Sequence, residues 1–203
     1  MPPSVNRLAI LRAVELECQN KGVDALHVAA VAAQLGVPRG AVAQFFHDEM
    51  TLLDAVLERH QSEYERAWQD VLPTLEEPRD VLRLLASSIA KLIHKEDGGQ
   101  AYVNIAAQMC TSTRFPLTTR PATTSAAALQ LMGKLTRTTG VPFALMPIRF
   151  ERMAAVLFAS VSSWIRQGQG RIPDDLFVED LVDTLAFISL APPSPHTQRH
   201  LEN

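Results

Sequence analysis

Residues 31–45, VAAQLGVPRGAVAQF, contain the break that most constrains how this chain folds. An alanine-rich helical run reaches Gly36, Pro38 follows two residues later, and a second short helical run begins at once. Glycine just past one helix and proline at the start of the next are typical stop and start signals. Two helices joined this tightly must cross at a steep angle, which suits a second helix that projects into the major groove of DNA.

The rest of the chain also predicts helices, because apolar residues recur at helical spacing and asparagine–glycine hairpin turns do not occur. Glycine and proline divide it into about nine helices, over residues 4–21, 28–35, 39–45, 49–71, 78–96, 100–113, 122–139, 147–167 and 174–191. We therefore expect an all-α fold with a three-helix helix-turn-helix domain at 1–50. A larger helical domain should occupy 51–191, and residues 192–203 should form a disordered tail.

The length of the chain suggests one large domain, or a small domain fused to a larger one. The chain has 203 residues, 47% of them hydrophobic, which is enough to bury a core. Cys18 and Cys110 lack metal-ligand spacing and are expected in the core. Arg7 and Arg12 interrupt the apolar stretch that a signal peptide would need, and no apolar run approaches the roughly 18 residues of a membrane span. We expect a cytoplasmic protein that does not bind membranes.

Residues 7–57 resemble the DNA-binding domain of the TetR family of transcriptional repressors. AILRAVELECQNKGVDAL is similar to the first helix of that family, VAAVAAQLGV to its second helix and turn, and PRGAVAQFFHDEMTLLDAVL to its recognition helix and fourth helix. The spacing from Gly22 through Gly36 to Phe46 also matches. The resemblance implies a homodimeric repressor that binds a palindromic double-stranded DNA operator and responds to a small ligand.

The expected recognition helix offers two long polar side chains, Arg39 and Gln44. Arginine can bind phosphate or guanine, and glutamine can bind adenine through both amide groups. His47 either contacts a phosphate or lies in a loop, while Phe45 and Phe46 are expected in the core. The predicted DNA-binding set comprises Arg7, Arg12, Arg39, Gly40, Ala41, Gln44 and His47.

Five positions depart from the pattern of that family. His27 stands where a capping serine or threonine is common, and Glu49 stands where lysine is common. Ala29 and Ala30 replace charged residues, and Ala43 replaces a tyrosine that binds phosphate. Lost phosphate contacts weaken DNA affinity. The alternative function is therefore a helical ligand-binding or protein-interaction dimer with weak or lost DNA binding.

Wide apolar stripes near the C-terminus favour packing against a second copy of the chain, and the predicted dimer interface comprises Val161, Leu181, Leu185 and Ile188. The predicted ligand pocket is lined by Tyr102, Ile105, Met109, Phe115, Leu131, Leu135, Phe143, Arg149, Phe158 and Trp164. Such a lining suits a small apolar or amphipathic ligand.

The span from Gly98 to Phe150 contains no acid but five bases. Arg114 or Arg149 can therefore bind an anionic end of the ligand, or these bases only balance acidic helices elsewhere in the chain.

An enzyme is not expected. The chain has no glycine-rich phosphate loop, no metal-spaced set of His, Cys and Glu, and no nucleophile elbow. We predict no catalytic residues, no metal site and no cofactor.

Overall fold

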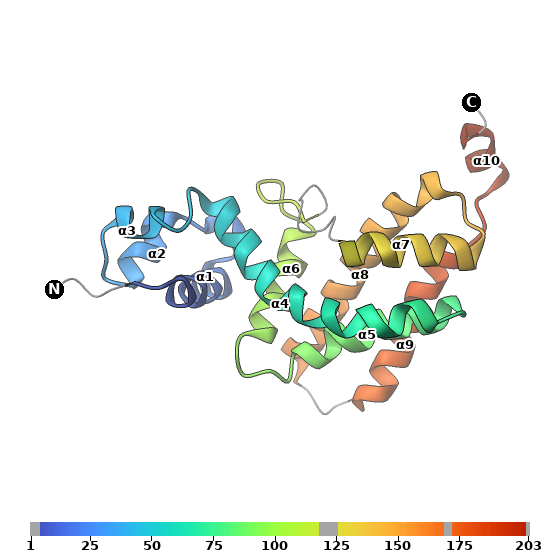
Figure 1. The fold of residues 1–203 in the computed structure, drawn as a ribbon, viewed down its shortest axis with the longest axis horizontal. Coiled ribbons are helices and arrows are strands. Elements are labelled where there is room, and N and C mark those ends of the chain that lie inside the picture. Colours follow the sequence, from blue (N-terminus) through green and yellow to red (C-terminus); the bar gives the residue numbers. More distant parts are fainter. Residues whose placement is uncertain (1–4, 118–125, 169–171, 202–203) are drawn as a thin grey trace. The chain divides into compact units, whose positions relative to one another are not determined.

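The structure is a computed structural model that describes residues 5–117, 126–168 and 172–201 (Figure 1). Within these ranges every regular element is helical, which confirms the all-α prediction. The α-helices are α1 (Arg7–Lys21), α2 (Val28–Gln34), α3 (Arg39–Ala43), α4 (Glu49–Val71), α5 (Pro78–Leu92), α6 (Gly99–Met109), α7 (Ala126–Thr139), α8 (Met146–Gln167), α9 (Asp174–Leu190) and α10 (Pro195–Leu201). Short 3-10 turns are η1 (Val23–Ala25), η2 (Leu72–Thr74) and η4 (Phe143–Leu145). None of the described helices is long and apolar enough to cross a membrane.

The chain divides into two compact units. The first combines residues 1–64 with 92–123, and the second combines 65–91 with 124–203. The first unit therefore joins the N-terminal helices to α6, which packs against α1. The boundary predicted at residue 50, between a DNA-binding domain and a ligand-binding domain, lies inside the first unit and stays a prediction.

The core of the first unit is built around α1. Asn6 caps this helix by accepting a hydrogen bond from the backbone N–H of Ala9 at 2.8 Å, and Gly22 ends it with φ +85°. The fully buried side chains of Ile10 and Val14 point into the core. Leu52 and Leu53 of α4 are also part of that core and have no exposed surface.

The second unit is held by α8 and α9, which run antiparallel. The Trp164 ring near the end of α8 stacks on Phe177 near the start of α9, with ring centroids 4.1 Å apart. At the opposite ends, Arg149 donates a hydrogen bond to the backbone carbonyl of Ser189 at 2.7 Å. Ion pairs also join α5 to α9, since Arg83 Nε lies 2.6 Å from Glu179 Oε1.

The residues predicted for a dimer interface lie elsewhere than expected. Val161 and Leu185 have no exposed surface, Leu181 is 3% exposed, and Ile188 is half-buried. Because α8 and α9 pack on each other through this face, these side chains form the core of the second unit instead of an outer surface. This corrects the prediction for Val161, Leu181 and Leu185.

The C-terminal segment also differs from expectation. Residues 195–201 form α10, so the prediction of a disordered tail is wrong for this stretch. Ser194 accepts a hydrogen bond from the backbone N–H of Thr197 at 3.2 Å, and Pro195 occupies the first helical position. A serine cap followed by proline is a favourable helix start, which outweighs the prolines that precede it.

Candidate nucleic-acid interface

The turn between α2 and α3 is a Schellman motif centred on Gly36. The N–H of Val37 donates to the carbonyl of Ala32 at 3.0 Å, and the N–H of Gly36 donates to the carbonyl of Ala33 at 3.1 Å. Gly36 adopts φ +65°, a left-handed conformation that other residues enter at a cost. This glycine therefore ends α2 and lets the chain start α3 only three residues later.

The angle between the two helices is fixed by buried apolar side chains. Val31 of α2 and Val42 of α3 have no exposed surface, and Phe46 just after α3 is 4% exposed. Pro38 precedes the first residue of α3 with φ −61° and ψ 145°, so it delivers the chain in an extended conformation. A five-residue helix gains little stability by itself, and α3 is therefore held by this packing.

The outer side of α3 carries the predicted DNA-binding residues. Arg39, Gly40 and Gln44 are exposed, and Ala41 is half-buried. A Cβ atom added to Gly40 would have nothing within 4 Å, so the packing of the protein does not require glycine there. The absent side chain instead leaves room for another molecule to approach the backbone closely.

The two phenylalanines after α3 have different environments. Phe46 is in the core as predicted, but Phe45 is 45% exposed, so the core prediction for Phe45 is wrong. Neighbouring residues at the end of a short helix point in different directions, and Val42 and Phe46 already fill the interior position.

The remaining predicted DNA-binding residues lie outside α3. Arg7 and Arg12 are exposed on α1, and His47 is exposed between α3 and α4. The Arg7 guanidinium lies 5.5 Å from the ring centroid of Phe46, a distance at which a cation–π attraction orients it. The Asp48 carboxylate accepts a hydrogen bond from the N–H of Thr51 at 2.7 Å and so caps the start of α4.

Glu49 caps α2 from a distance in the sequence. His27 makes no side-chain capping bond, and Glu49 Oε1 instead accepts the N–H of Val28 at 3.0 Å, with His27 Nδ1 at 3.7 Å. Burial favours the neutral form of Glu49, but hydrogen bonds from the backbone N–H groups of Val28 and Glu49 outweigh it. Arg114 and His27 act in the same direction, so the pKa of Glu49 lies below its usual value. The sequence comparison registered Glu49 only as the loss of a lysine and missed this internal role.

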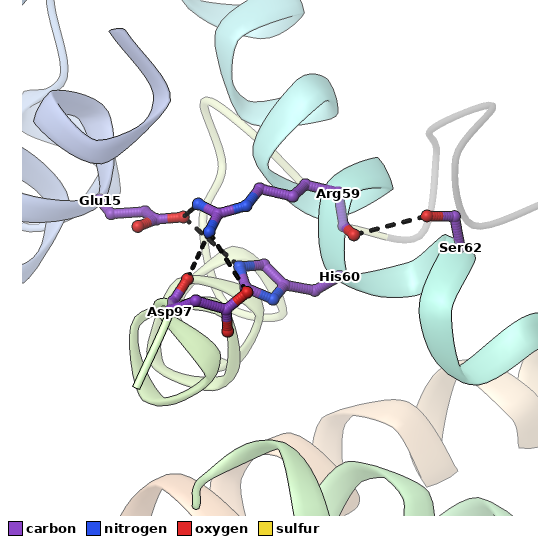
Figure 2. A network of polar contacts seen from close by, with 5 residues as sticks. All are labelled: Glu15, Arg59, His60, Ser62 and Asp97. Carbon is purple, nitrogen blue, oxygen red and sulfur yellow. Dashed lines mark hydrogen bonds and ion pairs between the residues drawn. The ribbon is translucent and has the colours of Figure 1, made fainter. Parts of the chain in front are cut away.

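A second unpredicted feature is a polar cluster centred on the buried Glu15 (Figure 2). Figure 2 shows Glu15 pointing from α1 toward Arg59 and His60 of α4, while Asp97 reaches the same guanidinium from the loop before α6. Arg59 Nη1 donates to Glu15 Oε1 at 3.1 Å, and Arg59 Nη2 donates to the Asp97 carbonyl at 2.6 Å. His60 Nε2 lies 3.4 Å from Glu15 Oε1. A Cβ on Gly98, whose φ is +104°, would come within 2.7 Å of Glu15 Oε2.

The far end of α6 holds the link between α1 and α2. The Gln108 side-chain oxygen accepts the N–H of Val23 at 2.9 Å. Arg114 donates to the carbonyls of Asp24 at 2.7 Å and Leu26 at 3.3 Å. Polar contacts from both ends of α6 therefore brace the N-terminal helices. Arg114 takes part in these contacts, and its binding of an anion remains a prediction.

The predicted ligand residues fall into two sets. Tyr102, Ile105, Met109 and Phe115 are buried in the first unit, and Leu131, Leu135, Phe158 and Trp164 are buried in the second. Phe143 is 69% exposed on η4, which does not fit a pocket lining. Burial, together with the neighbouring charge of Arg152, lowers the pKa of Arg149, whose guanidinium donates to Ser189 at the end of α9.

One buried polar atom stands out among the described residues. The indole N–H of Trp164, on a side chain only 4% exposed, has no hydrogen-bond partner there. An unsatisfied buried donor is costly and requires an explanation, such as a bound water or ligand.

The Cys18 thiol lies in the core of the first unit. Burial, followed by the charges of Glu17 and Glu15, raises the pKa of the Cys18 thiol to about 12, so this thiol remains protonated and inert. No group of three or more His, Cys, Asp and Glu side chains in those residues is arranged to hold a metal ion.

No protein-family model matches this sequence, and no curated protein is similar enough to be a relative. Solved structures do match over most of its length. A Rhodococcus protein assigned to the TetR family is 22% identical with a TM-score of 0.56, and the match covers 90% of this chain and 97% of that chain. A TetR-family transcriptional regulator from Streptomyces coelicolor is 19% identical with a TM-score of 0.53, over 90% and 97%. The fatty acid degradation regulator FadR from Bacillus halodurans is 14% identical with a TM-score of 0.51, over 87% and 92%. The likeness supports the resemblance carried by residues 7–57, and the chain has the fold of TetR-family transcriptional regulators.

Proposed function

We propose that this protein is a transcriptional repressor that binds a palindromic DNA operator as a homodimer and releases it in response to a small ligand. One observation carries the proposal. The Gly36 turn and the buried Val42 hold α3 so that Arg39, Gly40 and Gln44 lie on its outer side. A short, rigidly held helix with arginine and glutamine outward has the chemistry to read base edges in the major groove.

The decisive experiment measures operator binding. A duplex is selected from a random library with the full-length protein, and its affinity is measured for the wild type and for Arg39→Ala. We expect the substitution to weaken specific binding by about 1–3 kcal/mol. Arg137→Ala, an exposed arginine on α7, is the matched control and should leave affinity unchanged. Equal affinity of the two folded variants would remove Arg39 from the interface.

A second candidate function keeps the fold without useful DNA affinity. Ala29 and Ala43 are exposed and carry no charge, and Glu49 is committed to capping α2. Such a protein would be a ligand-binding or interaction dimer. Failure of the random library to yield any preferred duplex favours this candidate.

The dimer that the proposal requires needs an outer surface on α8 and α9. Phe187 of α9 is 80% exposed, Leu176 of α9 is 59% exposed, and Ile148 of α8 is 49% exposed. Exposed apolar side chains spread along two packed helices suit a four-helix interface with a second copy. We therefore move the proposed interface from the buried residues to this outward face.

The ligand proposed is apolar or amphipathic, because the buried members of the predicted lining, four in each unit, are apolar or aromatic. The indole N–H of Trp164 offers one hydrogen bond, so an acceptor on the ligand would be favoured. FadR is, by its name, a regulator of fatty acid degradation, and this makes fatty acids reasonable probes without fixing the ligand.

The ligand proposal is tested by thermal unfolding with fatty acids and fatty amines of equal length. We expect the acids, which carry acceptor oxygens, to stabilise the wild type more. Trp164→Phe should lose that difference. Without ligand it should be less stable than the wild type, because the smaller ring leaves a cavity where the indole stacks on Phe177, although removing the unpaired donor offsets part of that loss. A preference for the amine would overturn the proposal that a ligand acceptor binds the Trp164 indole N–H, and would leave only the proposal of an apolar site.

A further inference from the structure

We propose that Phe45 reads thymine, by packing its exposed ring against a thymine C5-methyl group beside the adenine that Gln44 binds. The inference rests on the proposed DNA-binding function and specifies the base chemistry of the operator.

The first support is the environment of Phe45. Its side chain is 45% exposed, although its backbone N–H is fixed to the carbonyl of Val42 at 3.0 Å. Phe46 and Val42 already fill the interior position below α3. A large ring on an ordered turn at the end of the candidate recognition helix is therefore free to contact another molecule.

The second support is the distribution of side chains around α3. Helical phase places Gly40 and Gln44 opposite the buried Val42, and it places Ala41 and Phe45 together on one flank. This flank is apolar, whereas the side-chain amide of Gln44 beside it can both donate and accept hydrogen bonds. The surface thus changes from polar to apolar over adjacent positions.

An A·T base pair shows a matching change. In the major groove adenine offers N7 and N6 to a glutamine side chain, and thymine offers O4 and the C5-methyl group. The methyl is the apolar feature that this groove presents, and phenylalanine and alanine are among the side chains that contact it. A phosphate contact would need a donor, which Phe45 lacks. The geometry therefore favours base reading over backbone contact for Phe45.

The test uses the duplex selected by the wild-type protein from a random library. Thymines in that duplex are replaced one at a time by deoxyuridine, which removes only the C5-methyl group. We expect at least one replacement to weaken wild-type binding by about fourfold, the effect of one buried methyl group. Phe45→Ala should bind the parent duplex more weakly and lose the discrimination at that thymine. Phe45→Leu should retain part of it.

Leu16→Ala is the matched control, because Leu16 lies on α1 in the same unit and is 46% exposed. It should discriminate against deoxyuridine as the wild type does. Equal discrimination by Phe45→Ala and the wild type would overturn the inference, as would a duplex insensitive to every replacement. Recovery of no preferred duplex is a different result, which overturns the proposed DNA-binding function and this inference with it.

Discussion

Glu49 caps the N-terminus of α2, where the His27 side chain makes no capping hydrogen bond. By family resemblance alone, Glu49 only replaces a lysine and so weakens DNA affinity. In the structure the carboxylate accepts the N–H of Val28 and satisfies one of the open donors at the start of α2. A substitution that looks damaging for binding is therefore favourable for the fold.

Replacing Glu49 with alanine should destabilise the protein by about 1 kcal/mol, because α2 loses its cap. The loss should depend on pH in a defined direction. The folded-state pKa of Glu49 is depressed, so its contribution is complete above the usual glutamate range and disappears as the pH falls through the folded pKa. Urea unfolding of both proteins at neutral pH and near pH 3 tests this. A difference that grows on acidification would contradict the capping role.

Glu15 should matter more than the other buried acid on α1. Glu15→Ala leaves Arg59 with only the Asp97 loop and removes the carboxylate beside His60, which should cost about 3 kcal/mol. Glu17→Ala is the matched control, since Glu17 is equally buried but its ion pair within the described residues is with the exposed Lys21. We expect the control to cost less than about 1 kcal/mol. Equal losses in urea unfolding would show that burial, not the cluster, sets the cost.

The boundaries and buried faces of the helices could be predicted from the sequence to different degrees. Gly22, Gly36 and Pro38 act locally, so the three N-terminal helices were predictable to within a few residues. Periodicity also found the apolar stripes of α8 and α9, but it cannot tell which side meets a neighbouring helix and which meets a second copy. The environments of Phe45 and Glu15 depend on contacts between distant segments, which no local pattern encodes.

Substitutions at an exposed and at a buried position of α9 should distinguish an effect on dimerisation from an effect on folding. Phe187→Asp introduces a charge at an 80% exposed position, so it should leave the fold intact but convert the dimer to a monomer. Leu185→Asp buries a charge at a position with no exposed surface and should prevent folding. Sedimentation with circular dichroism distinguishes the two results. A folded Phe187→Asp dimer would place the interface elsewhere.

The complete dimer should bind DNA with a modest salt dependence. Each copy presents three exposed arginines of the predicted DNA-binding set, Arg7, Arg12 and Arg39, so two copies neutralise at most six phosphates through them. The slope of log K against log salt concentration should then be about −5. Titrations of the selected duplex between 50 and 200 mM salt, a range of about fourfold, measure it. A slope near −10 would reveal phosphate contacts that these residues do not supply.

The capping role of Glu49 also bears on how such a regulator searches a genome. Non-specific attraction to DNA comes almost wholly from cations on phosphates, and it holds proteins on the vast excess of irrelevant sequence. A carboxylate stands where a phosphate-binding lysine is common, so this chain should dwell only briefly at each wrong site. If the protein binds DNA as proposed, fewer copies should then be sequestered by bulk chromosome, and a smaller cellular pool should be needed to occupy one operator.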